Sequence, residues 1–179
     1  MSATRHNLER LLSPRHAAFI GGEDAMHAAV RCAEGGFSGD IWGVNPRRTT
    51  LGDFPCFPSV GDLPAPPDAV FLAVPSATAV DVVAQLAALG AGGVVCYTAG
   101  FRELGGGGAE LEKVLAEVAG DLALVGPNVF GLLNYVSGAH LWPYAHGGKR
   151  VERGVALVSQ SGMFSGYVTT NQRSVAFSY

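Results

Sequence analysis

The sequence predicts an α/β protein with a doubly wound parallel sheet, and three observations lead to that expectation. Short apolar runs without polar alternation recur along the chain, which is typical of strands buried on both faces. Segments with helical periodicity separate these runs, as in repeated β-α-β units with right-handed crossovers. Most of the apolar runs end in glycine, proline or a small polar residue, where a backbone can turn tightly.

The elements follow from these patterns in chain order. The expected strands cover residues 17–20, 40–44, 69–74, 93–98 and 122–125. The expected helices cover residues 26–33, 77–89 and 111–118, where apolar residues recur at helical spacing. The proline-rich stretch 54–67 is expected to be a loop with one helical turn near Val60.

The alternation of strand and helix patterns stops at residues 134–153, which lack periodicity and are expected to form a linker or surface excursion. A new strand is expected at 155–158, a helix from Met163, and a last strand at 174–179. The sequence therefore predicts a first domain at 1–134, a linker at 135–153 and the truncated start of a second domain at 154–179. An uncovered last strand could pair with another chain, so a homo-oligomer is one expected state.

Composition narrows the class of protein. Hydrophobic residues make up 48% of the 179 residues and charged residues 15%, which is unlike a disordered chain. A net charge of −3 argues against a nucleic-acid or membrane partner. The three cysteines, Cys32, Cys56 and Cys96, lie far apart and are expected to be reduced thiols in a cytoplasmic protein. No metal-ligand spacing and no catalytic constellation is recognisable, so we assign no catalytic residue.

A ligand site is expected outside the carboxyl ends of the strands, where open parallel sheets bind their ligands. The Gly21-Gly22 turn before a helix suits a phosphate, although it lacks the full G-x-G-x-x-G spacing, and a tight turn without ligand is the alternative. After the second strand, Arg47 stands where NAD-binding domains place an acid. Arginine there suits a phosphorylated ribose, either of coenzyme A or of NADP, unless it is only a solvated surface residue.

Seven stretches, taken in order, resemble the NDP-forming acyl-CoA synthetases, which are related to the α subunit of succinyl-CoA synthetase. Each stretch alone is a modest signal, and their order and spacing make the resemblance specific. They are L-L-S-P-R-H-A-A-F-I-G-G at 11–22, G-G-F-S-G-D-I-W-G-V-N-P at 35–46, F-P-S-V-G-D-L-P at 57–64, D-A-V-F-L-A-V-P at 68–75, T-A-G-F-R-E-L-G at 98–105, G-P-N-V-F-G at 126–131 and V-A-L-V-S-Q-S-G at 155–162.

The resemblance implies a Rossmann-like first domain that binds coenzyme A at its strand ends. Carried onto this sequence, the family's site residues fall into four groups: Gly21 and Gly22 at the pyrophosphate, Asn45, Pro46 and Arg47 at the ribose and adenine, Val74, Pro75 and Ser76 at the middle of the site, and Thr98, Ala99 and Asn128 along the pantetheine arm and thioester end. The second domain is flavodoxin-like in the family. Its phosphate-binding turn, which receives a phosphohistidine, matches Ser159, Gln160, Ser161 and Gly162.

The implied function is the coenzyme A-binding part of an acid–thiol ligase. The family's phosphohistidine and ATP-grasp domain have no counterpart in these 179 residues, so the chain is not expected to be catalytically complete. The expected partners are coenzyme A or acyl-CoA and the remaining domains of the synthetase. Glu23 and Asp24 follow the glycine turn directly, where the family has a longer loop, which motivates a non-catalytic coenzyme A- or nucleotide-binding module as an alternative. An NADP-binding oxidoreductase domain is a third hypothesis, and the incomplete glycine fingerprint counts against it.

Overall fold

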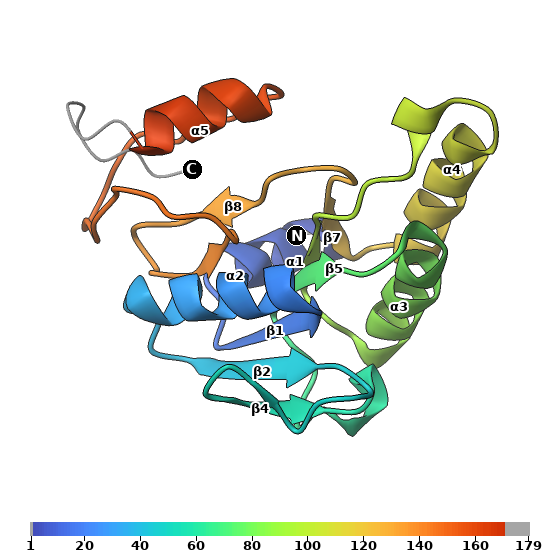
Figure 1. Ribbon diagram of the computed structural model, residues 1–179, viewed down its shortest axis with the longest axis horizontal. Coiled ribbons are helices and arrows are strands. Elements are labelled where there is room, and N and C mark those ends of the chain that lie inside the picture. Colours follow the sequence, from blue (N-terminus) through green and yellow to red (C-terminus); the bar gives the residue numbers. More distant parts are fainter. Residues whose placement is uncertain (1, 171–179) are drawn as a thin grey trace.

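The computed structural model describes residues 2–170, and a seven-stranded sheet lies at its centre in the order β3-β4-β2-β1-β5-β6-β7 (Figure 1). Every neighbouring pair in it is parallel except β3 and β4. Its strands are β1 (His16–Gly21), β2 (Asp40–Val44), β3 (Thr50–Leu51), β4 (Phe54–Phe57), β5 (Ala69–Ala73), β6 (Gly93–Cys96) and β7 (Ala123–Val125). The predicted doubly wound parallel sheet is therefore confirmed.

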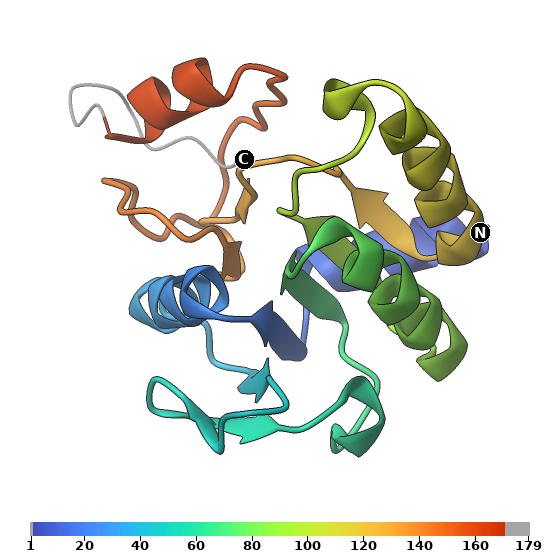
Figure 2. The same ribbon diagram turned by 45° about the vertical axis from the view of Figure 1, so that its right-hand side comes forward.

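Helices cover both faces of this sheet (Figure 2). They are α1 (Ala3–Leu12), α2 (Glu23–Glu34), α3 (Ser76–Leu89) and α4 (Gly107–Ala119), with 3-10 turns at Val60–Asp62 and Arg102–Leu104. Alternate residues of β1 face opposite sides, because successive side chains of a strand point to opposite faces. Ala18 and Ile20 pack in the core beneath α3 and α4, whereas Ala17 and Phe19 pack in the core beneath α1 and α2.

The proline-rich stretch is not wholly a loop, which corrects the sequence expectation. Residues 50–57 form a β-hairpin in which β4 pairs parallel with β2, and the expected helical turn near Val60 is confirmed by the 3-10 turn. Gly52 supplies the positive φ of +61° in the hairpin turn. Pro55 lies in β4 opposite Thr50 of the edge strand β3, so its missing N–H interrupts the ladder only at the sheet's margin.

The expectation of a surface excursion at residues 134–153 is also wrong for the first part of that segment. Two short strands, β8 (Leu132–Leu133) and β9 (His140–Leu141), pair antiparallel and pack over α2. Tyr135 and Trp142 are buried in this hairpin. An added Cβ at Gly35, just beyond α2, would lie 2.2 Å from the His140 ring. The absence of a side chain at Gly35 therefore leaves room for the hairpin to pack against the end of α2. Apolar side chains at irregular spacing thus form a small core that a search for periodicity overlooks.

The last part of the described chain differs from expectation in one element. Helix α5 (Gly162–Thr170) is confirmed, but residues 155–158 form no strand beyond an isolated bridge at Ala156. The strand expected at 174–179 lies outside the described residues. The division into two domains and a linker therefore stays a prediction. Within residues 2–170, none of the helices has the length and apolar character needed to cross a membrane.

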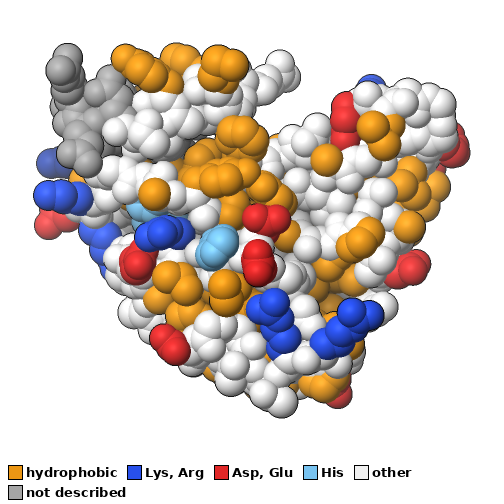
Figure 3. All heavy atoms as spheres, viewed as in Figure 1, with side chains coloured by type: hydrophobic (Ala, Val, Ile, Leu, Met, Phe, Trp, Pro, Cys, Tyr) orange, Lys and Arg blue, Asp and Glu red, His pale blue; other side chains and the backbone are white. Residues whose placement is uncertain are grey.

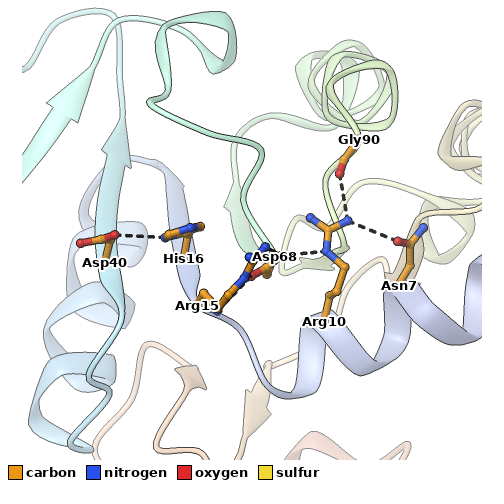
Figure 4. Close-up of polar contacts among 7 residues, drawn as sticks. All are labelled: Asn7, Arg10, Arg15, His16, Asp40, Asp68 and Gly90. Carbon is orange, nitrogen blue, oxygen red and sulfur yellow. Dashed lines mark hydrogen bonds and ion pairs between the residues drawn. The ribbon is translucent and has the colours of Figure 1, made fainter.

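Asp68, a buried residue that precedes β5, joins the amino edge of the sheet to α1 and the start of β1 (Figure 4). Its carboxylate accepts hydrogen bonds from Arg10 Nε at 2.7 Å and from Arg15 Nε at 2.9 Å, and from the Arg15 backbone N–H at 3.0 Å. Arg10 also donates to the Gly90 carbonyl oxygen at 2.9 Å. Burial alone would raise the pKa of Asp68, but these donors hold it well below its usual range.

Candidate functional site

The carboxyl edge of the sheet has one place where the chain reverses the direction in which it adds strands. From β1 the sheet extends one way to β2, and from β5 it extends the other way to β6 and β7. Open α/β sheets bind ligands in the crevice at such a reversal. Gly21 ends β1 there with φ +140°, and an added Cβ would lie 2.2 Å from the Ala73 carbonyl oxygen of β5. Glycine therefore allows the two strands to end side by side.

Two helices begin at this crevice, and both begin without a side-chain cap. The N-cap of α2 is Gly22 and that of α3 is Pro75, and neither forms a side-chain capping hydrogen bond. The first-turn N–H groups and the helix dipole at each end favour an anion. An added Cβ at Gly22 would meet nothing within 4 Å, so the space before α2 is open. The first turn of α2 carries Glu23 and Asp24, whereas that of α3 carries no acid, so α3 is the more favourable end for a phosphate.

A cavity of about 210 Å³, here called the β2 cavity, lies among the ends of β1, β2 and β5. The predicted residues on its wall are Gly21, Asn45, Pro46 and Val74. The Asn45 side chain donates to the Gly21 carbonyl oxygen at 2.8 Å and accepts from the Arg47 backbone N–H at 2.9 Å. Asn45 thereby holds the turn after β2 against the end of β1 and leads the chain out to an exposed Arg47.

A second cavity of about 400 Å³, here called the β6 cavity, adjoins the first, because Val74 lines both. The predicted residues on its wall are Val74, Pro75, Thr98, Ala99 and Asn128. The buried Thr98 hydroxyl donates to the Val74 carbonyl oxygen at 2.8 Å and accepts from the Val74 N–H at 3.3 Å. The Thr98 carbonyl oxygen accepts the Asn128 N–H at 2.9 Å. Thr98 thus ties the loops after β5, β6 and β7 together along one wall.

The structure brings eight of the eleven residues predicted for coenzyme A onto these two walls. Gly22, Arg47 and Ser76 line neither cavity, although each adjoins a residue that does. Other wall residues were not predicted from the sequence, among them Asp24, Tyr97 and Phe130 in the β6 cavity and Ser59, Val60 and Gln85 in the β2 cavity. The strand-end rule could have found Asp24 and Tyr97, which adjoin predicted turns, but no sequence signal marks Gln85 inside α3.

Aromatic residues flank the β6 cavity on the side of the β8–β9 hairpin. The Tyr97 hydroxyl lies 2.6 Å from the Tyr144 hydroxyl, and the Phe130 ring lies 5.5 Å from the Tyr144 ring. Burial, and then the hydrogen bond to Tyr144, raise the pKa of Tyr97 above its ordinary value. Burial likewise raises the pKa of Cys96, which ends β6, to about 11. Both groups therefore remain protonated at neutral pH, and the β6 cavity wall offers the neutral hydroxyl of Tyr97 and apolar contact.

The turn predicted to bind phosphate in a second domain begins α5. The Ser161 hydroxyl accepts the Phe164 N–H at 3.3 Å, and the Ser159 hydroxyl accepts the Ser161 N–H at 3.1 Å. Ser161 is therefore a serine cap of the kind that begins many helices. Ser159, Gln160 and Gly162 line a third cavity, on the other side of the loop at residues 128–130 from the β6 cavity. Within residues 2–170, no group of three or more His, Cys, Asp or Glu side chains could hold a metal ion.

Comparison with known proteins agrees with this geometry. Residues 21–134 match the family model described as a CoA binding domain. A trans-feruloyl-CoA synthase from an unknown prokaryotic organism is 35% identical over 177 residues, which cover 93% of this chain and 25% of that protein. ADP-forming acetate–CoA ligase II of Archaeoglobus fulgidus is 31% identical over 187 residues, covering 96% of this chain and 27% of the ligase. The chain thus spans about a quarter of the length of these relatives.

Solved structures show the same arrangement. The dinucleotide-forming acetyl-coenzyme A synthetase 1 of Candidatus Korarchaeum cryptofilum, in complex with phosphate and ADP, superposes with a TM-score of 0.80 at 28% identity. The match covers 90% of this chain and 36% of the synthetase chain. A protein of Pyrococcus horikoshii superposes with a TM-score of 0.81 at 27% identity, covering 90% of this chain and 38% of that one. The Rossmann-like sheet and its flanking helices are therefore shared with synthetases of this kind.

Proposed function

Because the chain belongs to the family of CoA binding domains, homologous to part of the NDP-forming acyl-CoA synthetases, we propose that it binds coenzyme A along the carboxyl edge of its sheet. The observation that carries this proposal is that the β2 and β6 cavities meet at Val74, beside the uncapped ends of α2 and α3. Two adjoining cavities at a topological switch point suit a long nucleotide ligand.

Each part of coenzyme A has a region of matching chemistry. The adenine and ribose would occupy the β2 cavity, with Asn45 and Pro46 on its wall and Arg47 reaching the 3′-phosphate from outside. The pyrophosphate would lie between the Gly21–Gly22 turn and the start of α3 at Ser76. The pantetheine arm would lie in the β6 cavity, along the wall formed by Val74, Pro75, Thr98, Ala99 and Asn128.

The whole protein's activity would then be that of an acid–thiol ligase, to which this chain contributes the coenzyme A-binding part. The relatives named above are coenzyme A synthases and ligases that are about four times as long as the matched segment. Catalysis would need their further domains, and the Ser159–Gly162 turn would face a phosphorylated histidine from one of them. Three free cysteines fit a cytoplasmic location.

Isothermal titration of the purified chain with coenzyme A, dephospho-CoA and NADP tests the proposal. We expect coenzyme A to bind tightest, and Arg47→Ala to weaken it about tenfold while leaving dephospho-CoA unchanged, because a charge-assisted contact to the 3′-phosphate is lost. The matched control is Arg5→Ala, which removes the same charge from exposed helix α1.

The outcomes separate the alternatives. Tighter binding of NADP than of coenzyme A would favour an oxidoreductase domain. Failure of all three ligands would indicate that the acidic turn at Glu23 and Asp24 closes the site, and would favour a domain that interacts through other surfaces. Equal effects of the Arg47 and Arg5 variants would place the 3′-phosphate elsewhere.

A further inference from the structure

A third cavity of about 860 Å³, here called the α5 cavity, lies between α1, the loop after β7 and the segment 157–169. Its wall carries no charged side chain among the described residues. Leu8, Leu12, Leu132, Trp142, Val158 and Met163 are on it, and its polar members are uncharged. Figure 3 shows hydrophobic side chains gathered below the α5 segment, beside a hollow that separates it from the lobe of α4. The cavity falls within the usual volume range of small-molecule sites.

The α5 cavity shares part of its wall with the β6 cavity. Asn128, Val129 and Phe130 line both, so the two spaces lie on either side of one short loop. The Phe130 side chain is 41% exposed, and its ring packs edge-on against Trp142 at 5.9 Å and against Tyr144 at 5.5 Å. A group that leaves the β6 cavity past Phe130 therefore enters apolar surroundings.

We propose that the α5 cavity receives the acyl group of an acyl-CoA, and that it selects uncharged, apolar acyl groups larger than acetyl. The inference rests on the proposed coenzyme A site, which places the thioester end in the β6 cavity beside Asn128. The acyl carbons attached there reach the loop shared by the two cavities. Aromatic and aliphatic side chains then cover them, and each buried methylene strengthens binding.

Charge supplies the selection against other acyl groups. An acyl chain that ends in a second carboxylate would bring an ionised group against Leu132 and Trp142, and none of the described residues on the wall is a cation that could pair with it. An acetyl group would pass no further than the shared loop and would leave the cavity unused. The favoured substrates are therefore medium-chain or aryl carboxylic acids.

Titration of the full 179-residue chain with coenzyme A, acetyl-CoA, hexanoyl-CoA and succinyl-CoA tests this selection. We expect hexanoyl-CoA to bind at least about tenfold tighter than acetyl-CoA, since several methylenes become buried. Succinyl-CoA is expected to bind no tighter than acetyl-CoA. Equal affinities for the acetyl, hexanoyl and succinyl thioesters, with coenzyme A itself binding, would overturn the inference and leave the proposed function intact. Failure of coenzyme A to bind would overturn both.

A matched pair of surface variants locates the acyl group. Met163 is 88% exposed at the α5 cavity, and Val155 is 68% exposed outside its wall, so neither substitution disturbs a buried core. Met163→Asp should reduce the preference for hexanoyl-CoA over acetyl-CoA to about threefold or less, while coenzyme A affinity stays within about twofold. Val155→Asp should leave the preference unchanged. A preference that survives Met163→Asp, or that falls equally in both variants, would show that the acyl group lies elsewhere.

Discussion

The two edges of the same sheet use charge in opposite ways. At the amino edge, the buried Asp68 carboxylate is surrounded by Arg10 and Arg15, so the protein satisfies its own charges (Figure 4). At the carboxyl edge, Arg47 and Arg48 are exposed and take part in none of the ion pairs between described residues. One edge therefore contributes to stability, whereas the other leaves its charges and helix ends available for a ligand.

Removal of Asp68 should have the largest effect on stability. Asp68→Ala leaves the Nε groups of Arg10 and Arg15 and the Arg15 backbone N–H without their acceptor, which should lower the free energy of unfolding by about 3 kcal/mol. Urea denaturation followed by circular dichroism measures this change. Asp53→Ala, at an exposed turn, is the control and should shift the unfolding free energy by less than about 0.5 kcal/mol. A similarly small shift for Asp68→Ala would mean that the amino edge does not fasten the fold.

Acid should weaken the same edge by a somewhat smaller amount. Because the pKa of Asp68 is lowered in the folded protein, its stabilisation is complete above the ordinary aspartate pKa. The contribution is lost as pH falls through that value toward the lower folded one, and it should amount to about 2 kcal/mol. Urea midpoints measured between pH 7 and pH 3 should fall more steeply in the wild type than in Asp68→Asn. Parallel pH profiles would contradict the assignment.

Much of the fold could be predicted from the sequence because buried parallel strands leave a strong local signal. Uniformly apolar runs such as Ala69–Ala73, each followed by a periodic helix, have few alternative interpretations. The β3–β4 and β8–β9 hairpins were missed because their strands are two to four residues long and owe their burial to distant partners. Leu133 and Trp142, for example, become core residues only when the hairpin packs over α2.

The candidate site was predictable to the extent that it consists of strand ends. Thr98 and Asn128 could be named because both follow apolar runs, and the structure joins them by a hydrogen bond of 2.9 Å. Gln85 and Phe130 could not, since a helix-interior residue and a loop aromatic reach the cavities only through tertiary packing. The Asp68 cluster was missed for a similar reason, because its arginines precede it by more than 50 residues.

Salt should weaken ligand binding at the carboxyl edge more than it weakens the ion pairs at the amino edge. Raising the salt concentration from 50 to 500 mM screens exposed charges, so coenzyme A affinity should fall about tenfold. The buried Asp68 pairs are screened much less, and the urea midpoint at neutral pH should change little beyond the general effect of salt on folding. Titration and denaturation in the same buffers measure both quantities. An affinity that does not depend on salt would exclude a role for the exposed arginines in holding phosphate.

Asp24 tests whether the two uses of charge can conflict at one residue. It lies in the first turn of α2, where a carboxylate stabilises the helix by interacting with its dipole, and on the wall of the β6 cavity, where it repels an anionic ligand. Asp24→Asn should therefore raise coenzyme A affinity about threefold and lower the free energy of unfolding by about 0.5 kcal/mol. Titration and urea denaturation measure the two effects.

The matched control is Glu110→Gln, which removes an acid from the first turn of α4, away from both coenzyme A cavities. It should lower the free energy of unfolding by a similar amount and leave the affinity unchanged, because it removes the dipole interaction and an exposed ion pair with Lys113 but no contact to the ligand site. If Asp24→Asn instead weakened binding, the carboxylate would be an acceptor for the ligand, since the pantetheine arm carries amide N–H groups that pass through this cavity in the proposed pose. The carboxyl edge would then hold its ligand by hydrogen bonds to an acid as well as by its arginines and helix ends.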